Sequence, residues 1–176
     1  MGWAARGSIS GGFVEGASRE GFLSAINVSV YSYIAMAKRM VPLMAGHKAS
    51  LLTLSYLGGE KVVPNYNTMG LCKAALESAT RYIAADVGPQ GIRANTLSCG
   101  PIKTLAASGI KGFSSMLAQC KAVSPTRSLV SIDEVGNTAA FLLSDNSLGI
   151  TAETIYIDGG FNALACCVDQ TASENA

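Results

Sequence analysis

Two tyrosines and a lysine, Tyr56, Tyr66 and Lys73, are the residues whose types and spacing suit acid–base and binding chemistry. Seven positions separate Tyr66 from Lys73, which on a helix is about two turns, or roughly 10 Å along one face. The phenol and the ammonium can therefore line one groove. The same pair is also common on helices that have only a structural role, so its place in the fold decides between the two interpretations.

A predicted strand sets the position of this pair. The apolar run from Ser50 to Tyr56 is bounded by turn residues, which favours a strand covered on both faces. Tyr56 lies at its carboxyl end, and Gly58-Gly59 ends it. A second predicted strand, from Ile92 to Ser98, ends at the turn Gly100-Pro101. Ligands of open α/β sheets bind outside the carboxyl ends of the strands, so these turns are expected to border a binding crevice.

Helices and a third strand complete the expected α/β fold. Apolar residues that recur at three and four predict one long helix from Ser18 to Met44 and another from Tyr66 to Val87. A short helix from Phe113 to Ala122 is followed by a helix that begins after a Ser131 N-cap, and the strand from Thr154 to Asp158 comes last. Because helices alternate with strands, the sequence predicts a parallel sheet with right-handed crossovers.

The composition excludes several other classes of protein. Of 176 residues, 49% are hydrophobic and 14% are charged, which is unlike a disordered chain and fits one domain. The net charge of +1 argues against a nucleic-acid or acidic-membrane partner, and no uninterrupted apolar run of about 18 residues marks a membrane span. One histidine and five cysteines without a Cys-x-x-Cys pair argue against a metal site or a cysteine protease. The expected compartment is the cytoplasm, and the low charge favours burial of surface against other copies of the chain.

Five sequence blocks occur in the order typical of the short-chain dehydrogenase/reductase superfamily, and within it they resemble the bacterial enoyl-acyl-carrier-protein reductases. The blocks are LLTLSYLG (51–58), PNYNTMGLCK (64–73), GPIKTLAASG (100–109), DEVGN (133–137) and IDGGF (157–161). Most members of the superfamily have three residues between the active tyrosine and lysine. This branch has six, as does the present chain, and a second tyrosine upstream. The resemblance covers the chain from Gly2 to about Ala163.

The resemblance implies the C-terminal half of a Rossmann-like doubly wound parallel sheet, with about three strands and flanking helices. Residues 1–163 then form a partial reductase domain, and residues 164–176 form a flexible tail. The dinucleotide site of this family begins with a strand and a Gly-rich turn, but no such turn follows a strand before Ser50. We therefore expect that about ninety N-terminal residues of the family fold are absent, together with the adenosine and pyrophosphate sites.

The activity implied by the resemblance is the NADH-dependent reduction of the 2,3 double bond of enoyl-acyl-carrier-protein thioesters in fatty-acid biosynthesis, by a homotetramer. Tyr66 matches the tyrosine that donates a hydrogen bond to the enolate oxygen formed in this reaction. Lys73 matches the lysine that holds the hydroxyl groups of the nicotinamide ribose, so NAD is the implied cofactor. Tyr56 matches the upstream tyrosine that borders the substrate.

Two further sets of residues match binding positions of the family. The first set matches the segment that touches the nicotinamide and the pyrophosphate, with a plain turn after Gly-Pro as the alternative. It consists of Ile102, Lys103, Thr104, Leu105 and Ala106. The second set matches the substrate site, where an acyl chain needs apolar walls, with core packing as the alternative. It consists of Ile110, Phe113 and Met116, together with the backbone of Ala4.

Two alternatives to an active enoyl reductase remain open. In the first, the chain is a non-catalytic fragment or an assembly subunit of such an enzyme. The missing Gly-rich turn favours this alternative, and the two long predicted helices match the family's tetramer-forming pair. In the second, the chain is a ketoacyl reductase of the same superfamily, against which the six-residue spacing and the upstream Tyr56 argue.

Overall fold

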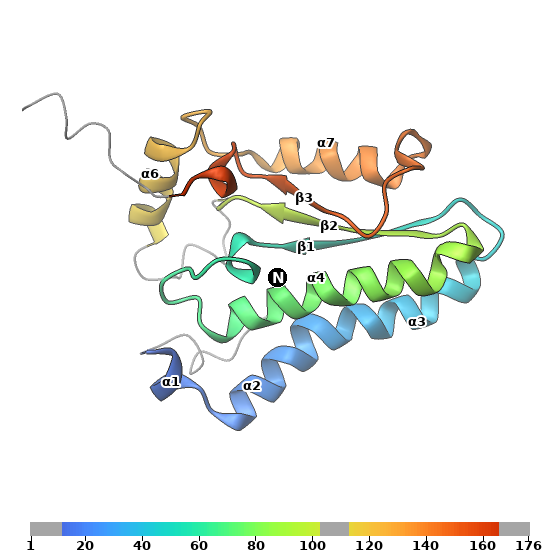
Figure 1. Cartoon of the computed structure of the whole chain (residues 1–176), viewed down its shortest axis with the longest axis horizontal. Coiled ribbons are helices and arrows are strands. Elements are labelled where there is room, and N and C mark those ends of the chain that lie inside the picture. Colours follow the sequence, from blue (N-terminus) through green and yellow to red (C-terminus); the bar gives the residue numbers. More distant parts are fainter. Residues whose placement is uncertain (1–11, 103–112, 166–176) are drawn as a thin grey trace, which may run out of the picture.

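The structure, a computed structural model of the chain, describes residues 12–102 and 113–165. Its centre is a parallel sheet of three strands in the order β1-β2-β3 (Figure 1). The strands are β1 (Ser50–Ser55), β2 (Arg93–Cys99) and β3 (Thr154–Ile157). The α/β class and the parallel sheet predicted from the sequence are confirmed.

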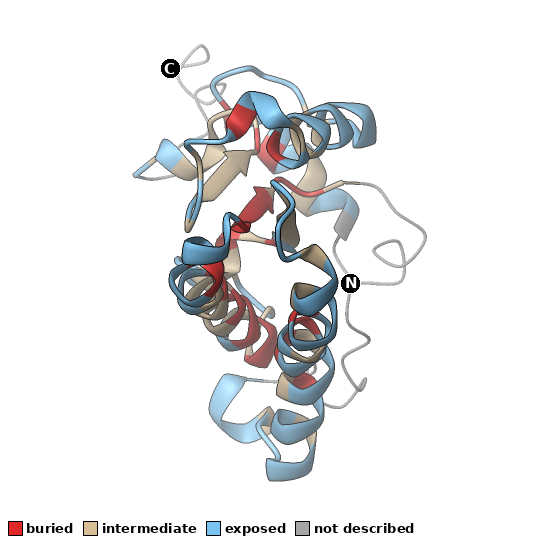
Figure 2. Cartoon of the chain, turned by 90° about the vertical axis from the view of Figure 1, so that its right-hand side faces the viewer, coloured by how far each residue is buried: buried red, intermediate tan, exposed pale blue. Residues whose placement is uncertain are grey.

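The central strand β2 is the most buried part of the sheet. Every residue from Arg93 to Ser98 is buried, because helices pack on both faces of the strand and another strand flanks each edge. β1 forms an edge of the described sheet, and its Leu54 is 50% exposed. The predicted cover of this strand on both faces is therefore incomplete at Leu54. Figure 2 shows the buried residues concentrated on β2 and on the inner sides of the long helices.

A long helical segment precedes the sheet and runs from Arg19 to Met44 in three parts. These parts are α2 (Arg19–Ile26), a π turn (Asn27–Tyr31) and α3 (Ser32–Met44). Ser18 caps its start, because the hydroxyl accepts a hydrogen bond from the backbone N–H of Gly21 at 3.0 Å. The predicted helix from Ser18 to Met44 is confirmed, whereas the π turn within it and the short helix α1 (Phe13–Gly16) before it were not predicted.

α4 (Thr68–Val87) packs between this helical segment and the sheet (Figure 1). On one side it shares a buried apolar cluster with α2 and the π turn. The cluster consists of Ala25, Val30, Met69 and Cys72. On the other side, the hydroxyl of Thr96 on β2 donates a hydrogen bond to Thr80 of α4 at 2.8 Å. This central position of α4 brings its first turns to the carboxyl end of β1.

Two more helices follow β2, and they are α6 (Phe113–Val123) and α7 (Ile132–Leu143). α7 covers the face of the sheet opposite α4 (Figure 1). It begins with a capping box, in which Ser131 and Glu134 exchange hydrogen bonds between side chain and backbone, as the Ser131 N-cap predicted. The buried guanidinium of Arg93 donates to carbonyl oxygens at the other end of α7, which ties this helix to β2.

Four 3-10 helices occur in the described ranges, and they are η3 (Leu57–Gly59), η4 (Gly88–Gln90), η5 (Asp145–Ser147) and η6 (Phe161–Ala163). Within the same ranges, no helix has the length and apolar character needed to cross a membrane. The described residues also contain no cluster of three or more His, Cys, Asp or Glu side chains arranged to hold a metal ion. Residues 166–176 of the expected tail lie outside the described part of the chain.

Candidate active site

The carboxyl end of β1 leads directly into the candidate site. Tyr56 continues the extended backbone of the strand, with φ −153° and ψ 150°, and η3 then turns the chain. This turn places the backbone of Gly58 against the ring of Tyr66, since a Cβ on Gly58 would lie 2.4 Å from Tyr66 Cδ1. A Cβ on Gly70 would likewise lie 2.7 Å from the Gly58 carbonyl oxygen. Close packing therefore requires glycine at both positions.

Tyr56 and Tyr66 form an edge-to-face pair. Their ring centroids are 5.0 Å apart and the ring planes are inclined at 72°. Burial raises the pKa of Tyr56 to about 12, and burial together with the neighbouring Tyr56 raises the pKa of Tyr66. Both side chains are therefore phenols at neutral pH, with an O–H group to donate. The hydroxyl of Tyr56 donates to Sδ of Met116 on α6, at 3.9 Å.

Lys73 approaches the same strand end from α4. Its side chain is buried, and Nζ donates a hydrogen bond to the carbonyl oxygen of Leu54 at 2.9 Å. Burial lowers the pKa of Lys73, while the neighbouring Cys72, Cys99 and Glu77 act in the opposite direction. An ammonium group has three N–H donors, so the bond to Leu54 leaves donors for the hydroxyl groups of a ligand.

The structure corrects the predicted geometry of Tyr66 and Lys73. α4 begins at Thr68, so Tyr66 does not lie on the helix, and the expected two-turn separation along one helix face is wrong. The cause is Asn67, whose φ of 44° and ψ of −125° are incompatible with a helix. Tyr66 instead lies in the turn before α4 and folds back onto Gly58, while Lys73 reaches the strand end from the second turn of the helix.

The other predicted site residues are described only in part. Met116 lies beside Tyr56, and Ile102 lies partly buried just beyond the carboxyl end of β2. Phe113 is the first residue of α6. Six predicted residues lie outside the described parts of the chain, and they are Ala4, Lys103, Thr104, Leu105, Ala106 and Ile110.

The sequence matches known proteins over most of its length. The protein-family model described as Enoyl-(Acyl carrier protein) reductase matches residues 1–162. The chain belongs to this family. One relative is the Enoyl-[acyl-carrier-protein] reductase [NADH] FabI of Escherichia coli (strain K12), which is 52% identical over 165 residues, or 94% of this chain and 63% of the relative.

Solved structures of this reductase family share the fold of the chain. The enoyl-acyl carrier protein reductase of Bacillus cereus, in complex with NADP+ and indole naphthyridinone, has a TM-score of 0.90 and 44% identity over 94% of this chain and 63% of its own. The reductase of Anaplasma phagocytophilum, in complex with NAD, has a TM-score of 0.87 and 42% identity over 94% of this chain and 62% of its own. The predicted family and the Rossmann-like fold are confirmed. The chain spans less than two thirds of the length of each of these three relatives.

Two polar residues beside this candidate site were not predicted from the sequence. Ser55 immediately precedes Tyr56, and its hydroxyl donates a hydrogen bond to the carboxylate of Glu77 on α4. Glu77 follows Lys73 by four positions, so the two side chains project from neighbouring turns of one helix face. A carboxylate at this distance after a candidate lysine is the signal that could have identified Glu77.

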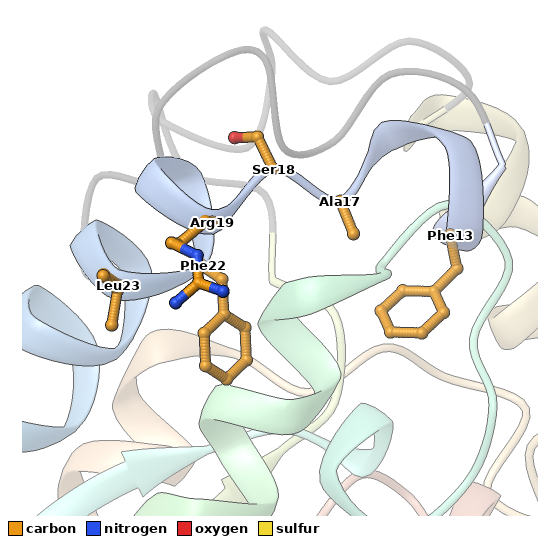
Figure 3. Close-up of a pocket in the computed structure, with 6 residues that line it drawn as sticks. All are labelled: Phe13, Ala17, Ser18, Arg19, Phe22 and Leu23. Carbon is orange, nitrogen blue, oxygen red and sulfur yellow. The ribbon is translucent and has the colours of Figure 1, made fainter.

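A separate cavity lies at the start of the long helical segment (Figure 3). Its volume is about 380 Å³. Figure 3 shows the rings of Phe13 and Phe22 on two sides of it. The lining residues are Phe13, Ala17, Ser18, Arg19, Phe22 and Leu23. The tyrosines and Lys73 are not among them, so this cavity is distinct from the candidate active site of the reductase fold.

Proposed function

We propose that this chain carries the catalytic site of an NADH-dependent enoyl-acyl-carrier-protein reductase, which reduces the 2,3 double bond of the enoyl thioester. The observation that carries this proposal is the edge-to-face pair of Tyr56 and Tyr66 beside buried Lys73, at the carboxyl end of β1. The name of the Escherichia coli relative, at 52% identity, supports the same reaction.

Tyr66 supplies the hydrogen-bond donor that this reaction needs. Negative charge develops on the thioester oxygen during the reduction, and a phenol placed there stabilises the charge by donating its O–H. The raised pKa of Tyr66 keeps the phenol protonated. Tyr56 contacts both Tyr66 and Met116, which suits a place along the acyl thioester.

The donor groups of Lys73 fit the ribose of a dinucleotide. A reduced nicotinamide, when bound, supplies the hydride that adds to the β-carbon of the enoyl group. Lys73 would hold the ribose hydroxyl groups with the N–H donors that Leu54 does not use, which orients the cofactor for reaction. NADH is favoured because the Escherichia coli relative is named for it and the Anaplasma phagocytophilum reductase binds NAD. The proposal includes as further cofactor-binding residues Ile102, Lys103, Thr104, Leu105 and Ala106.

The proposal extends to the partners expected from the sequence. The substrate is an enoyl group on acyl carrier protein, as the names of the relatives indicate. Ala4, Ile110 and Phe113 are proposed to line the substrate site together with Met116. The active form is proposed to be a homotetramer in the cytoplasm.

Turnover by a Tyr66→Phe variant tests the proposal. The purified protein, supplied with the N-terminal part of the reductase fold that the sequence predicts to be absent, is mixed with NADH and a trans-2-enoyl thioester of acyl carrier protein, and NADH absorbance is followed. We expect kcat to fall about 100-fold, because phenylalanine keeps the ring packing but cannot donate a hydrogen bond. Tyr82→Phe is the matched control, since Tyr82 is an exposed tyrosine of α4, and its kcat should equal that of the wild type.

Each other outcome of this assay favours a different conclusion. Equal kcat in the wild type and in Tyr66→Phe contradicts the role of Tyr66. A wild-type protein that binds NADH but turns over no thioester supports the alternative of an assembly subunit. A wild-type protein that reduces ketoacyl and not enoyl thioesters supports the ketoacyl reductase.

A further inference from the structure

α4 holds the last two residues of β1 with two polar side chains. Lys73 Nζ donates a hydrogen bond to the carbonyl oxygen of Leu54 at 2.9 Å. One helical turn further along, the carboxylate of Glu77 accepts a hydrogen bond from the hydroxyl of Ser55. Both bonds act on the residues immediately before Tyr56, so this strand end cannot rotate without breaking one of them.

Glu77 also lies close to the chain after Tyr56. A Cβ on Gly59 would lie 3.0 Å from Glu77 Oε1 and 2.9 Å from the backbone nitrogen of Ala74. Only the bare backbone of a glycine fits this close to α4. The carboxylate is therefore near the chain on both sides of Tyr56, at Ser55 before it and at Gly59 after it.

The backbone of Tyr56 transmits this constraint to its side chain. Tyr56 is extended, with φ −153° and ψ 150°, so its side chain and that of Ser55 project to opposite sides of the chain. When the hydroxyl of Ser55 is held toward α4, the ring of Tyr56 is held in the opposite direction. There it meets Tyr66 and Met116.

The surroundings of Glu77 disfavour a charged group. Burial raises its pKa, and the hydrogen bond from Ser55 is the strongest influence in the opposite direction, followed by the charge of Arg81. An apolar pair in place of Ser55 and Glu77 would pack without this desolvation cost. It would not fix the direction of the strand end, because apolar contacts are non-directional.

We propose that Glu77 is a positioning residue for Tyr56. By accepting the hydrogen bond of Ser55, it holds the Tyr56 phenol in the orientation used at the reductase site. This inference rests on the proposed function, but the position of the ring can be measured without turnover. The competing explanation is that Glu77 serves only to pack α4 on the sheet.

Four variants separate the hydrogen bond from the other properties of Glu77. Ser55→Ala and Glu77→Ala remove the bond, whereas Glu77→Gln keeps an acceptor oxygen and removes the charge. Asp86→Asn, at an exposed position of the same helix, is the matched control for the change of charge. Each variant is labelled with meta-fluorotyrosine, and a Tyr56→Phe sample assigns the Tyr56 resonance in the fluorine NMR spectrum.

We expect the Tyr56 resonance to shift or broaden in Ser55→Ala and Glu77→Ala. It should keep its wild-type position in Glu77→Gln and Asp86→Asn. In the turnover assay, Ser55→Ala and Glu77→Ala should lose about tenfold in kcat, because Tyr56 is misplaced. Ser55→Ala should keep the wild-type KM for NADH, since it leaves both Lys73 and the neighbouring Glu77 in place. Glu77→Gln should recover most of this loss, because its amide oxygen still accepts the hydrogen bond.

An unchanged Tyr56 resonance in Ser55→Ala and Glu77→Ala overturns the positioning role. A Glu77→Gln variant that is as impaired as Glu77→Ala overturns it as well. A wild-type protein that does not reduce enoyl thioesters contradicts the proposed function instead, and the fluorine spectra still decide whether Glu77 positions Tyr56. If Glu77→Ala fails to fold, the comparison of Ser55→Ala with Glu77→Gln gives the same decision.

Discussion

Burial acts in opposite directions on the two kinds of ionisable side chain at the site. It raises the pKa of Tyr56 to about 12, and it also raises the pKa of Tyr66, because a buried phenolate is disfavoured. It lowers the pKa of Lys73, because a buried ammonium is disfavoured. As the pH rises, the lysine therefore loses its proton before either phenol does.

This order of titration predicts the pH–rate profile. We expect kcat/KM for NADH to fall as the pH rises through the pKa of Lys73, which lies below the ordinary value of 10.5. The fall should be complete before Tyr56 titrates at about 12. An arginine side chain stays charged at every accessible pH. The pH–rate profile of the Lys73→Arg variant should therefore lack this alkaline decline, whatever the maximal rate of the variant. If Lys73→Arg shows the same decline as the wild type, another group is responsible.

At the scale of the elements, the sequence predicted the features that depend on neighbouring residues. Ser18 and Ser131 cap their helices as expected, since an N-cap needs only a hydroxyl beside free backbone N–H groups. The apolar run of β1 and the glycine turn after it are also located as predicted. Such features follow from local chemistry, which the sequence contains directly.

Features that depend on distant residues or on unusual backbone angles were not predicted. Periodicity extends α4 back to Tyr66, because it cannot detect the positive φ of Asn67. The bond between Ser55 and Glu77 joins residues 22 positions apart, and only the packing of α4 on the sheet reveals it. Resemblance therefore proposed Tyr66 and Lys73 as site residues, but the geometry that relates them came from the structure.

Gly58→Ala tests whether the turn at η3 positions the two tyrosines. The added methyl group would lie 2.4 Å from Tyr66 Cδ1 and 3.4 Å from Tyr56 Cδ1, so the Tyr66 ring must move. We expect the free energy of unfolding to fall by about 1–3 kcal/mol, and kcat to fall by about tenfold or more. Urea unfolding and steady-state kinetics measure the two effects.

Gly136→Ala is the matched control for this substitution. Gly136 lies inside α7, and a Cβ there meets nothing within 4 Å. Alanine should raise the free energy of unfolding by about 0.5–1 kcal/mol, because it is a better helix former than glycine. Its kcat should not change. A Gly58→Ala variant as stable and as active as the wild type would contradict the close contact between the turn and Tyr66.

At the scale of the whole molecule, the long helical segment exposes an apolar stripe. Tyr33 and Ala37 of α3 are buried on the side that faces α4. Beside them, Met36, Met40 and Leu43 recur at the spacing of one helix face, and each is at least 42% exposed. Exposed apolar stripes of this kind mark protein interfaces. The stripe agrees with the low charged fraction of the chain, 14%, and with the homotetramer that we propose.

Substitutions in this stripe test the proposed self-association. We expect the wild-type protein to sediment as an oligomer. The double variant Met36→Glu, Leu43→Glu should sediment as a smaller species, because forming the interface would bury each new carboxylate among apolar side chains. Lys38→Glu is the control, since Lys38 lies on the opposite side of α3 and should leave the oligomer unchanged. Sedimentation velocity at several protein concentrations gives the species, and circular dichroism verifies that the helices are retained. A wild-type protein that is monomeric at every concentration contradicts the proposed oligomer. If the double variant sediments like an oligomeric wild type, the interface between subunits lies on another surface.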